Sequence, residues 1–193
     1  MKFSEMKYER PDLAAVKDEL HVLTERLKAA RDYAEAREAF LAHEAAYIHM
    51  ETQATLASVR HTIDTRDEFY DAEETFWNAA TPELDAYEDA WKGTMLESPF
   101  RKEFAAEYGD LMFVNAEIAR KAFSPEIIPE SQQENDLSQA YSKLIASAQI
   151  PFEGGVYTIS QLSPFKNDPD DARRLAAWKA EGVWYKEHQT EFD

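Results

Sequence analysis

PDLAAVKDELHVLTERLK, residues 11–28, carries the clearest periodic pattern in the chain. Its apolar residues recur at alternating spacings of three and four positions, at Leu13, Val16, Leu20, Leu23 and Leu27. On an α-helix this spacing gathers the side chains into one narrow seam, which must be buried against another helix. The stretch therefore predicts a fold built by packing long helices against one another.

The next segment supplies the partner helix. Asp32 followed by Glu35 forms a capping-box pattern, and an apolar face follows it at Phe40, Tyr47, Met50, Ala54 and Ala57. Because the connection to the preceding helix is short, we expect the two helices to be antiparallel neighbours.

A third helix is predicted to begin at a second capping-box pattern, Thr65 with Glu68. Its apolar stripe runs through Phe69, Ala72, Phe76, Ala80, Tyr87, Trp91 and Met95. Pro82 lies inside this stripe, and Thr81 before it could cap a new helix, so we expect a kink or a short break there.

The second half of the chain is predicted to hold shorter helices, and its character changes only from Gln149 onward. Ser98 ends the third helix, Gly109 separates two short helices, and Ser124 with Pro125 begins a helix towards Ala148. Gly-Gly between β-branched and aromatic residues then predicts a β-hairpin near 149–162. The predicted class is all-α with one small hairpin. The predicted regions are a helical region 1–148, a hairpin region 149–165 and a helix over 166–193.

Composition narrows the function classes. The chain of 193 residues has 21 Lys and Arg against 38 Asp and Glu, a net charge of −17, which argues against binding nucleic acid. It contains no cysteine, which excludes disulfides, zinc ribbons and thiol nucleophiles. We find no long uncharged apolar run and no signal-peptide pattern, so we expect a cytoplasmic protein without a membrane partner.

One histidine lies in a near-motif for zinc. His43-Glu44-Ala45-Ala46-Tyr47 matches the metallopeptidase pattern H-E-x-x-H except at its last position, where tyrosine replaces the second imidazole. Two imidazoles one helical turn apart are what hold the metal in that motif. We therefore interpret His43 as a boundary residue of the helical core, with a metal site around His43 and Glu44 as the minor alternative. No catalytic or metal-binding residue is predicted in this chain.

Arg60, His61 and Asp64 are the candidate substrate-lining residues. They place a cation, an imidazole and a carboxylate where the second helix ends and the third begins. Such a group could bind a carboxylate or a peptide terminus. Helix C-termini also recruit cationic residues for structural reasons, and we favour that interpretation.

Several segments, taken in order, are similar to a known family. They are MKFSEMKYERPDL (1–13), RHTIDTRDEFYDAEETFW (60–77), LESPFRKEF (96–104), FSPEII (123–128), SKLIASAQIPFEG (142–154) and SQLSPFKNDPDDARRLAAW (160–178). Together they resemble the N-terminal part of oligoendopeptidase F-type enzymes, relatives of thimet oligopeptidase.

The resemblance implies a role without catalysis. In that family a helical shell surrounds a channel in which zinc, held by H-E-x-x-H and a downstream glutamate, cleaves short peptides. No position here matches those motifs, so the resemblance implies a noncatalytic helical portion that walls the channel. Its implied partners are the catalytic region of the same polypeptide, which would carry the zinc, and oligopeptide substrates.

Two further expectations follow for the isolated chain. The apolar surface of the last helix, including Trp178, Val183 and Trp184, would be covered by the region that follows it. Without that region, we expect the fragment to self-associate as a homo-oligomer or the last helix to be mobile. The alternative function is a stand-alone acidic helical interaction module that accepts a partner helix or an extended peptide.

Overall fold

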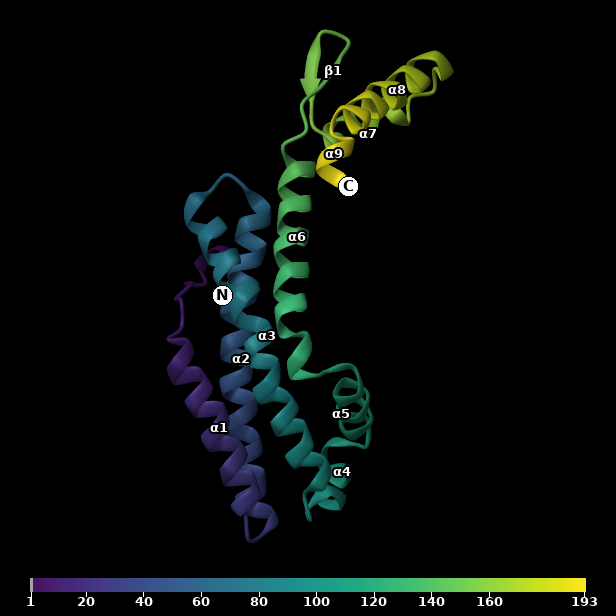
Figure 1. Cartoon of the computed structure of the whole chain (residues 1–193). Helices are drawn as coiled ribbons and strands as arrows, with labels where there is room; N and C mark the ends of the chain where they lie inside the picture. The colour runs from purple at the N-terminus through teal and green to yellow at the C-terminus, as the bar shows by residue number, and fades with distance from the viewer. Residues whose placement is uncertain (1) are drawn as a thin grey trace. The chain divides into compact units, whose positions relative to one another are not determined.

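The computed structural model describes residues 2–193 and confirms the predicted class. The chain divides into two compact units, one ending at Asp136 and the other spanning Leu137–Asp193. Within the described residues the structure is helical apart from one two-stranded antiparallel hairpin and its connections (Figure 1). Each unit is described by itself below.

Three long helices form the first unit: α1 (Leu13–Ala29), α2 (Tyr33–Ile63) and α3 (Glu68–Glu97). Each of the three packs against the other two, and they run side by side in Figure 1. Leu20, Leu23 and Leu27 of the predicted seam are buried, as the periodicity requires. A short 3₁₀ turn, η1 (Phe3–Glu5), precedes them.

Helix caps decide where these helices begin. Asp32 caps α2 by accepting a hydrogen bond from the Glu35 amide, as predicted. The prediction for α3 is wrong by two residues, because its cap is Asp67 and not Thr65. The Asp67 carboxylate accepts hydrogen bonds from the Phe69 and Tyr70 amides in the first turn, and its negative charge interacts favourably with the positive end of the helix dipole.

Helix α3 passes through Pro82 without a break. A proline inside a helix removes one backbone hydrogen bond and costs about 3 kcal/mol. Here the residues on both sides, Trp77 and Ala80 before it and Leu84 after it, are buried in one cluster with α1 and α2. Packing of both halves against the same neighbours keeps the helix continuous.

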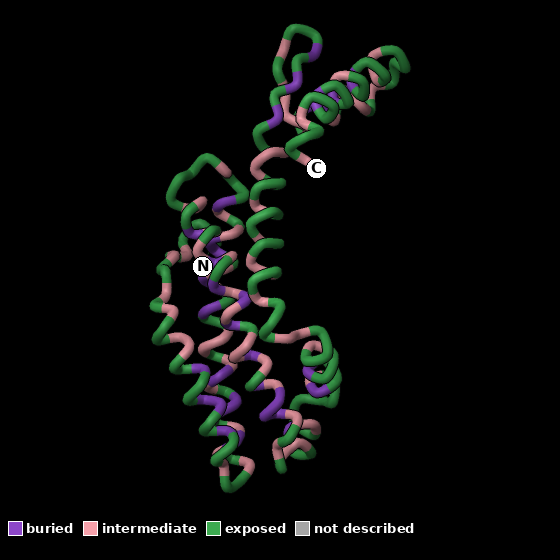
Figure 2. Tube along the Cα trace, in the orientation of Figure 1, coloured by how far each residue is buried: buried purple, intermediate pink, exposed green. Residues whose placement is uncertain are grey.

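Two apolar clusters fill the first unit, and Figure 2 shows the buried residues lining the facing sides of its helices. One cluster lies around Leu20, Met50, Ala57, Trp77, Ala80 and Leu84. The other holds Leu27, Ala36, Ala39, Phe40, Trp91, Met95, Phe104 and Phe113. The second cluster includes side chains from the short helices that follow α3, so those helices are part of the core.

The short helices are α4 (Arg101–Tyr108) and α5 (Leu111–Ala122). Gly109 separates them, as predicted, with φ = +88°, a backbone conformation that glycine adopts more easily than other residues. A 3₁₀ turn, η2 (Pro125–Ile127), leads into α6 (Ile128–Ala146), with Ser124 as the cap. The first half of α6 is tied to α3 by Gln132 and Asn135, whose amides donate to backbone carbonyls.

The second unit contains the hairpin and the last helices. Strands β1 (Ile150–Phe152) and β2 (Gly155–Tyr157) are antiparallel, with Ile150 opposite Tyr157. The two turn residues, Glu153 and Gly154, have φ of +48° and +80°, which matches the tight turns that suit a hairpin. The hairpin is shorter than the predicted region 149–165, because the later residues of that region form α7 (Ile159–Lys166).

Helix α8 (Asp171–Glu187) begins at an Asp170 cap, and α9 (Gln189–Phe192) follows it. Trp184 is 5% exposed and packs in the cluster of this unit, beside Phe192. The expectation that a following region covers Trp184 is therefore wrong. Trp178 and Val183 are 54% and 55% exposed, so that part of the predicted apolar surface does face outward.

Candidate functional site

Arg60 contacts residues of the N-terminal segment and of α3. Its guanidinium donates to the Tyr70 hydroxyl at 2.7 Å and to the backbone carbonyl of Met6. It also lies over the Phe3 ring at 5.7 Å. These contacts attach the N-terminal segment and α3 to the end of α2.

His61 and Asp64 have different surroundings. His61 is 2% exposed, and its Nε2 lies 3.3 Å from the Asp71 carboxylate on α3. Asp64 is exposed, and a hydrogen bond from Arg66 holds the pKa of its carboxyl below the ordinary value. The structure thus gives Arg60, His61 and Asp64 separate partners. Contact of any of them with a substrate stays a prediction.

His43 lies deep between α2 and α3. Its imidazole is 1% exposed and stacks on the Trp91 indole, with ring centroids 3.8 Å apart and planes 2° from parallel. Nε2 lies 3.0 Å from Oε1 of Glu88, and Nδ1 lies 3.9 Å from Glu44. The 3.0 Å contact lacks hydrogen-bond alignment, so across residues 2–193 neither imidazole nitrogen has a hydrogen-bond partner.

The donor set at His43 does not fit zinc. A catalytic zinc site needs three protein ligands, and in H-E-x-x-H two of them are imidazoles. Tyr47 stands where the second imidazole would be. Within the described part of the chain, no group of three or more His, Asp or Glu side chains is placed to hold a metal ion.

Two carboxylates set the charge state of His43. Burial of the imidazole lowers its pKa, but the nearby carboxylates of Glu44 and Glu88 outweigh burial, so the pKa of His43 is raised above its ordinary value. Lys92 also lies in this group, with Nζ 4.0 Å from Glu88. Sequence reasoning missed Glu88, although its spacing of three and four from Trp91 and Leu84 places it on the core-facing side of α3.

A cavity of about 320 Å³ adjoins these residues between α2, α3 and α5. Its walls are mostly apolar and include Phe40, Trp91, Met95 and Met112. Charged groups enter it from two helices, Glu44 from α2 and Glu88 with Lys92 from α3. We call this cavity the α2–α3–α5 pocket.

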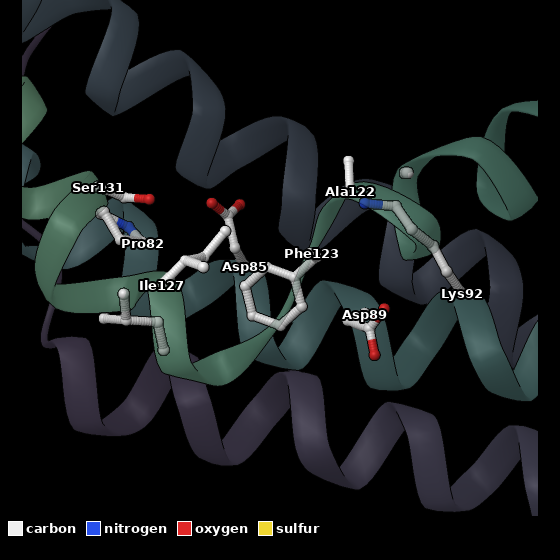
Figure 3. A pocket seen from close by; sticks show the side chains of 10 residues that line it. Pro82, Asp85, Asp89, Lys92, Ala122, Phe123, Ile127 and Ser131 are labelled. Carbon is white, nitrogen blue, oxygen red and sulfur yellow. The ribbon is translucent and has the colours of Figure 1, made fainter.

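A second cavity, of about 260 Å³, lies beside α3 where η2 and α6 begin (Figure 3). Its lining includes Asp85, Asp89, Lys92, Phe123 and Ile127. Desolvation raises the pKa of the Asp85 carboxyl, and the nearby charge of Lys92 opposes this shift. Asp89 is paired with Arg120 at 3.2 Å, so its charge is already balanced.

The helical unit matches a known family. Residues 3–123 match the model of the Peptidase M3 N-terminal domain, and the chain belongs to this family. The matched range covers α1 to α5, including every residue discussed around His43 and around Arg60. A comparison with curated proteins finds no match.

Solved structures extend the likeness over almost the whole chain. One is an X-ray structure assigned to oligoendopeptidase F, 37% identical, with a TM-score of 0.95 over 99% of this chain. Pz peptidase A, solved with an inhibitor, is 35% identical, and a protein from Bacillus anthracis assigned to oligoendopeptidase F is 32% identical, each with a TM-score of 0.95. This chain spans only about a third of each of those chains, 34%, 34% and 35%.

A helix that spans a membrane must be both long and apolar. Across residues 2–193, none is both long enough and apolar enough to cross a bilayer.

Proposed function

We propose that this chain is the noncatalytic N-terminal portion of a zinc oligopeptidase that hydrolyses short peptides. The observation that carries the proposal is the match of 99% of this chain to about a third of the oligopeptidase structures, at 32% to 37% identity. The chemistry would come from a catalytic region of the same polypeptide, where zinc would be held. The residues around His43 do not supply that site.

The role of this portion is to wall the substrate channel. A helical wall needs rigidity, and the three long helices provide it through two buried clusters. Apolar side chains also remain on the surface of α5, where Leu111 and Ile118 are 68% and 60% exposed. These two residues lie two turns apart on the same side of α5, and their exposure supports an interface with the catalytic region as partner.

Activity measurements on separated parts test this proposal. The 193-residue chain should not cleave a quenched fluorescent peptide and should hold no stoichiometric zinc. Mixing it with the catalytic region, read from the coding sequence after Asp193, should restore chelator-sensitive cleavage. Cleavage by the 193-residue chain alone would overturn the noncatalytic assignment, and a stop codon after Asp193 would overturn the assignment as part of a longer enzyme.

Surface variants refine the test of the interface. Leu111→Asp with Ile118→Asp changes only exposed positions of α5, and it should reduce recovery of activity on mixing while leaving the fold intact. The matched control is Val22→Asp on α1, where the side chain is 47% exposed. Equal recovery with both variants would show that α5 does not contact the catalytic region.

A further inference from the structure

Helix α8 is apolar on two opposite sides. Ala177 and Trp184 face the core of its own unit and are buried. The side turned away from that core carries Leu175, Trp178 and Val183, which are 55%, 54% and 55% exposed. A surface helix normally places polar side chains there, and a helix that is apolar all round is normally buried. We call this side the α8 outer face, and it consists of Leu175, Trp178, Lys179, Gly182, Val183, Tyr185 and Lys186.

A glycine lies in the middle of the α8 outer face. A stripe with spacings of three, four and three residues runs along about three turns, at Leu175, Trp178, Gly182 and Tyr185. Glycine inside a helix is less stable than alanine, because it loses more backbone freedom on folding. No neighbouring atom lies within 4 Å of a Cβ built at Gly182, so the contacts of this unit do not require glycine there. A second helix that packs closely on α8 would require it, because the distance between two helix axes depends on the side chains at their contact.

The Trp178 indole is held in place although it is exposed. The Lys166 ammonium lies over its ring, 4.7 Å from the centroid. Lys166 is ion-paired with Glu181, and both side chains are 10% exposed. The indole therefore contacts a largely buried ion pair and still presents about half of its surface to solvent. A fixed tryptophan loses little side-chain freedom on binding, and tryptophan is among the residues that contribute most to protein interfaces.

The charge of the α8 outer face is opposite to that of the chain. Lys179 and Lys186 are exposed, and within residues 2–193 neither forms an ion pair. Glu181 is the single acidic residue from 172 to 186, and it is paired with Lys166. The whole chain, in contrast, has a net charge of −17. An acidic surface is therefore the electrostatic complement of the α8 outer face.

We propose that the α8 outer face packs against an acidic amphipathic helix, which crosses α8 at Gly182 and belongs to the catalytic region of the same polypeptide. This inference rests on the proposed function. Two observations support this occupant: the positive charge of the face, and the length of the similar structures, of which this chain matches only 34% to 35%. Apolar side chains of the docked helix contact Trp178, and its carboxylates face Lys179 and Lys186. A second copy of this chain is the competing occupant, but a symmetric contact would bring the lysines of both copies together.

Cysteine labelling tests whether α8 is covered. Because the chain contains no cysteine, Val183→Cys places a single thiol on the α8 outer face, and Val22→Cys on α1 is the matched control at 47% exposure. Labelling by a maleimide is compared between the 193-residue chain, diluted until light scattering shows a monomer, and the longer polypeptide read from the coding sequence. Peptide mapping locates the label. In the longer polypeptide the rate for Val183→Cys should fall by about tenfold or more, and the rate for Val22→Cys should stay within about twofold.

Gly182→Leu tests the crossing point. The added side chain enters open space, so the 193-residue chain should keep its unfolding midpoint or gain stability. In the longer polypeptide the same change should prevent close packing and speed the labelling of Val183→Cys by about tenfold. The matched control is Gln133→Leu, which adds leucine at an exposed position of α6 and should leave Val183→Cys protected. A glycine with a role only inside this unit would not change the labelling.

Reversing the charge of the face tests the chemistry of the partner. Lys179→Glu with Lys186→Glu should speed the labelling of Val183→Cys in the longer polypeptide by about fivefold at low salt, because two exposed ion pairs become repulsive contacts. The difference should shrink in high salt. Slower labelling than in the parent would show a basic partner surface and would overturn the assignment of an acidic helix.

The outcomes separate this inference from the proposed function. Chelator-sensitive cleavage by the longer polypeptide supports the proposed function whatever the labelling shows. Equal labelling of Val183→Cys in the two forms, or continued protection in Gly182→Leu, overturns the docking of a helix on α8. Protection that depends on protein concentration in the longer polypeptide assigns the face to a second copy and also overturns the proposal. A stop codon after Asp193 overturns both.

Discussion

Replacing Glu73 by glutamine tests how the N-terminal segment is held to the helical unit. Glu73 on α3 is 4% exposed, and its carboxylate accepts three hydrogen bonds from that segment. Arg10 donates through Nε at 2.8 Å and through a terminal nitrogen at 2.7 Å, and the Tyr8 hydroxyl donates as well. Trp77 in turn donates its indole N–H to the Tyr8 oxygen at 3.1 Å.

The expected loss of folding stability depends on how exposed each partner of Glu73 is. The Arg10 side chain is 47% exposed and can regain water, so the full cost of breaking a buried ion pair does not apply. The Tyr8 contact is partly buried, and the glutamine amide would direct a donor at one of its former donors. We expect Glu73→Gln to lower the free energy of unfolding by about 1.5–3 kcal/mol, the range for hydrogen bonds to a charged group.

The pH dependence gives an independent check on the same pair. The hydrogen bond from Arg10 is the main reason that the pKa of Glu73 lies below its ordinary value. A depressed pKa in the folded state contributes stability above the unfolded pKa, near 4.3, and this contribution is lost as pH falls through the folded pKa. The difference in stability between the parent and Glu73→Gln should therefore shrink below about pH 4.

Urea unfolding followed by far-UV circular dichroism measures both effects. The control is Glu25→Gln, which removes an exposed ion pair with Lys28 within α1 and should not shift the unfolding midpoint measurably. The reasoning would be refuted if Glu73→Gln unfolded within about 0.5 kcal/mol of the parent, the scatter of neutral surface changes.

Four further predictions concern single features. Gly109→Ala should lower the free energy of unfolding by about 1–3 kcal/mol, because φ at Gly109 is +88°. Gly182→Ala inside α8 should raise it by about 0.5–1 kcal/mol, and no atom outside the helix would contact the added methyl group. Thermal unfolding that finds Gly109→Ala more stable than Gly182→Ala would contradict both expectations. Trp184→Ala should destabilise the second unit by about 3–5 kcal/mol, and hydrogen exchange of α7 and α8 unchanged from the parent would contradict it. The raised pKa of His43 contributes stability that is present below about pH 6.5 and lost as pH rises through the folded pKa, so an NMR titration midpoint below 6.5 would refute that contribution. The exposed ring of Trp178 should support concentration-dependent self-association in light scattering, and a constant monomer mass that Trp178→Glu does not change would refute it.

Local signals were sufficient for most of the fold. The seam ending at Leu27, the Asp32 cap, the Gly109 separation and the hairpin turn each depend on residues within one or two turns of the chain. Such signals act through backbone geometry and through the spacing of apolar residues, and both can be read in sequence order. The cap of α3 is Asp67 and not the predicted Thr65, because two capping signals lie only two residues apart in this segment.

The candidate pocket could not be read in the same way. Glu88 and His43 are 45 positions apart in the sequence, and only the packing of α3 against α2 brings them to 3.0 Å. Glu44 belongs to the near-motif for zinc, which the sequence shows. Glu88, in contrast, is one of many acidic residues in a strongly acidic chain. A carboxylate on a helix has the same local signature whether it faces water or a core.

The sequence by itself determined the helices, most of their ends, the single hairpin and the family resemblance. Tertiary structure alone decided that Glu73 holds Arg10 and Tyr8, that Trp184 is buried within its own unit, and that Glu88 on α3 lies 3.0 Å from His43 on α2. The physical reason is that propensity and capping act over a few residues, whereas burial of a charge or a ring depends on which distant helix covers it.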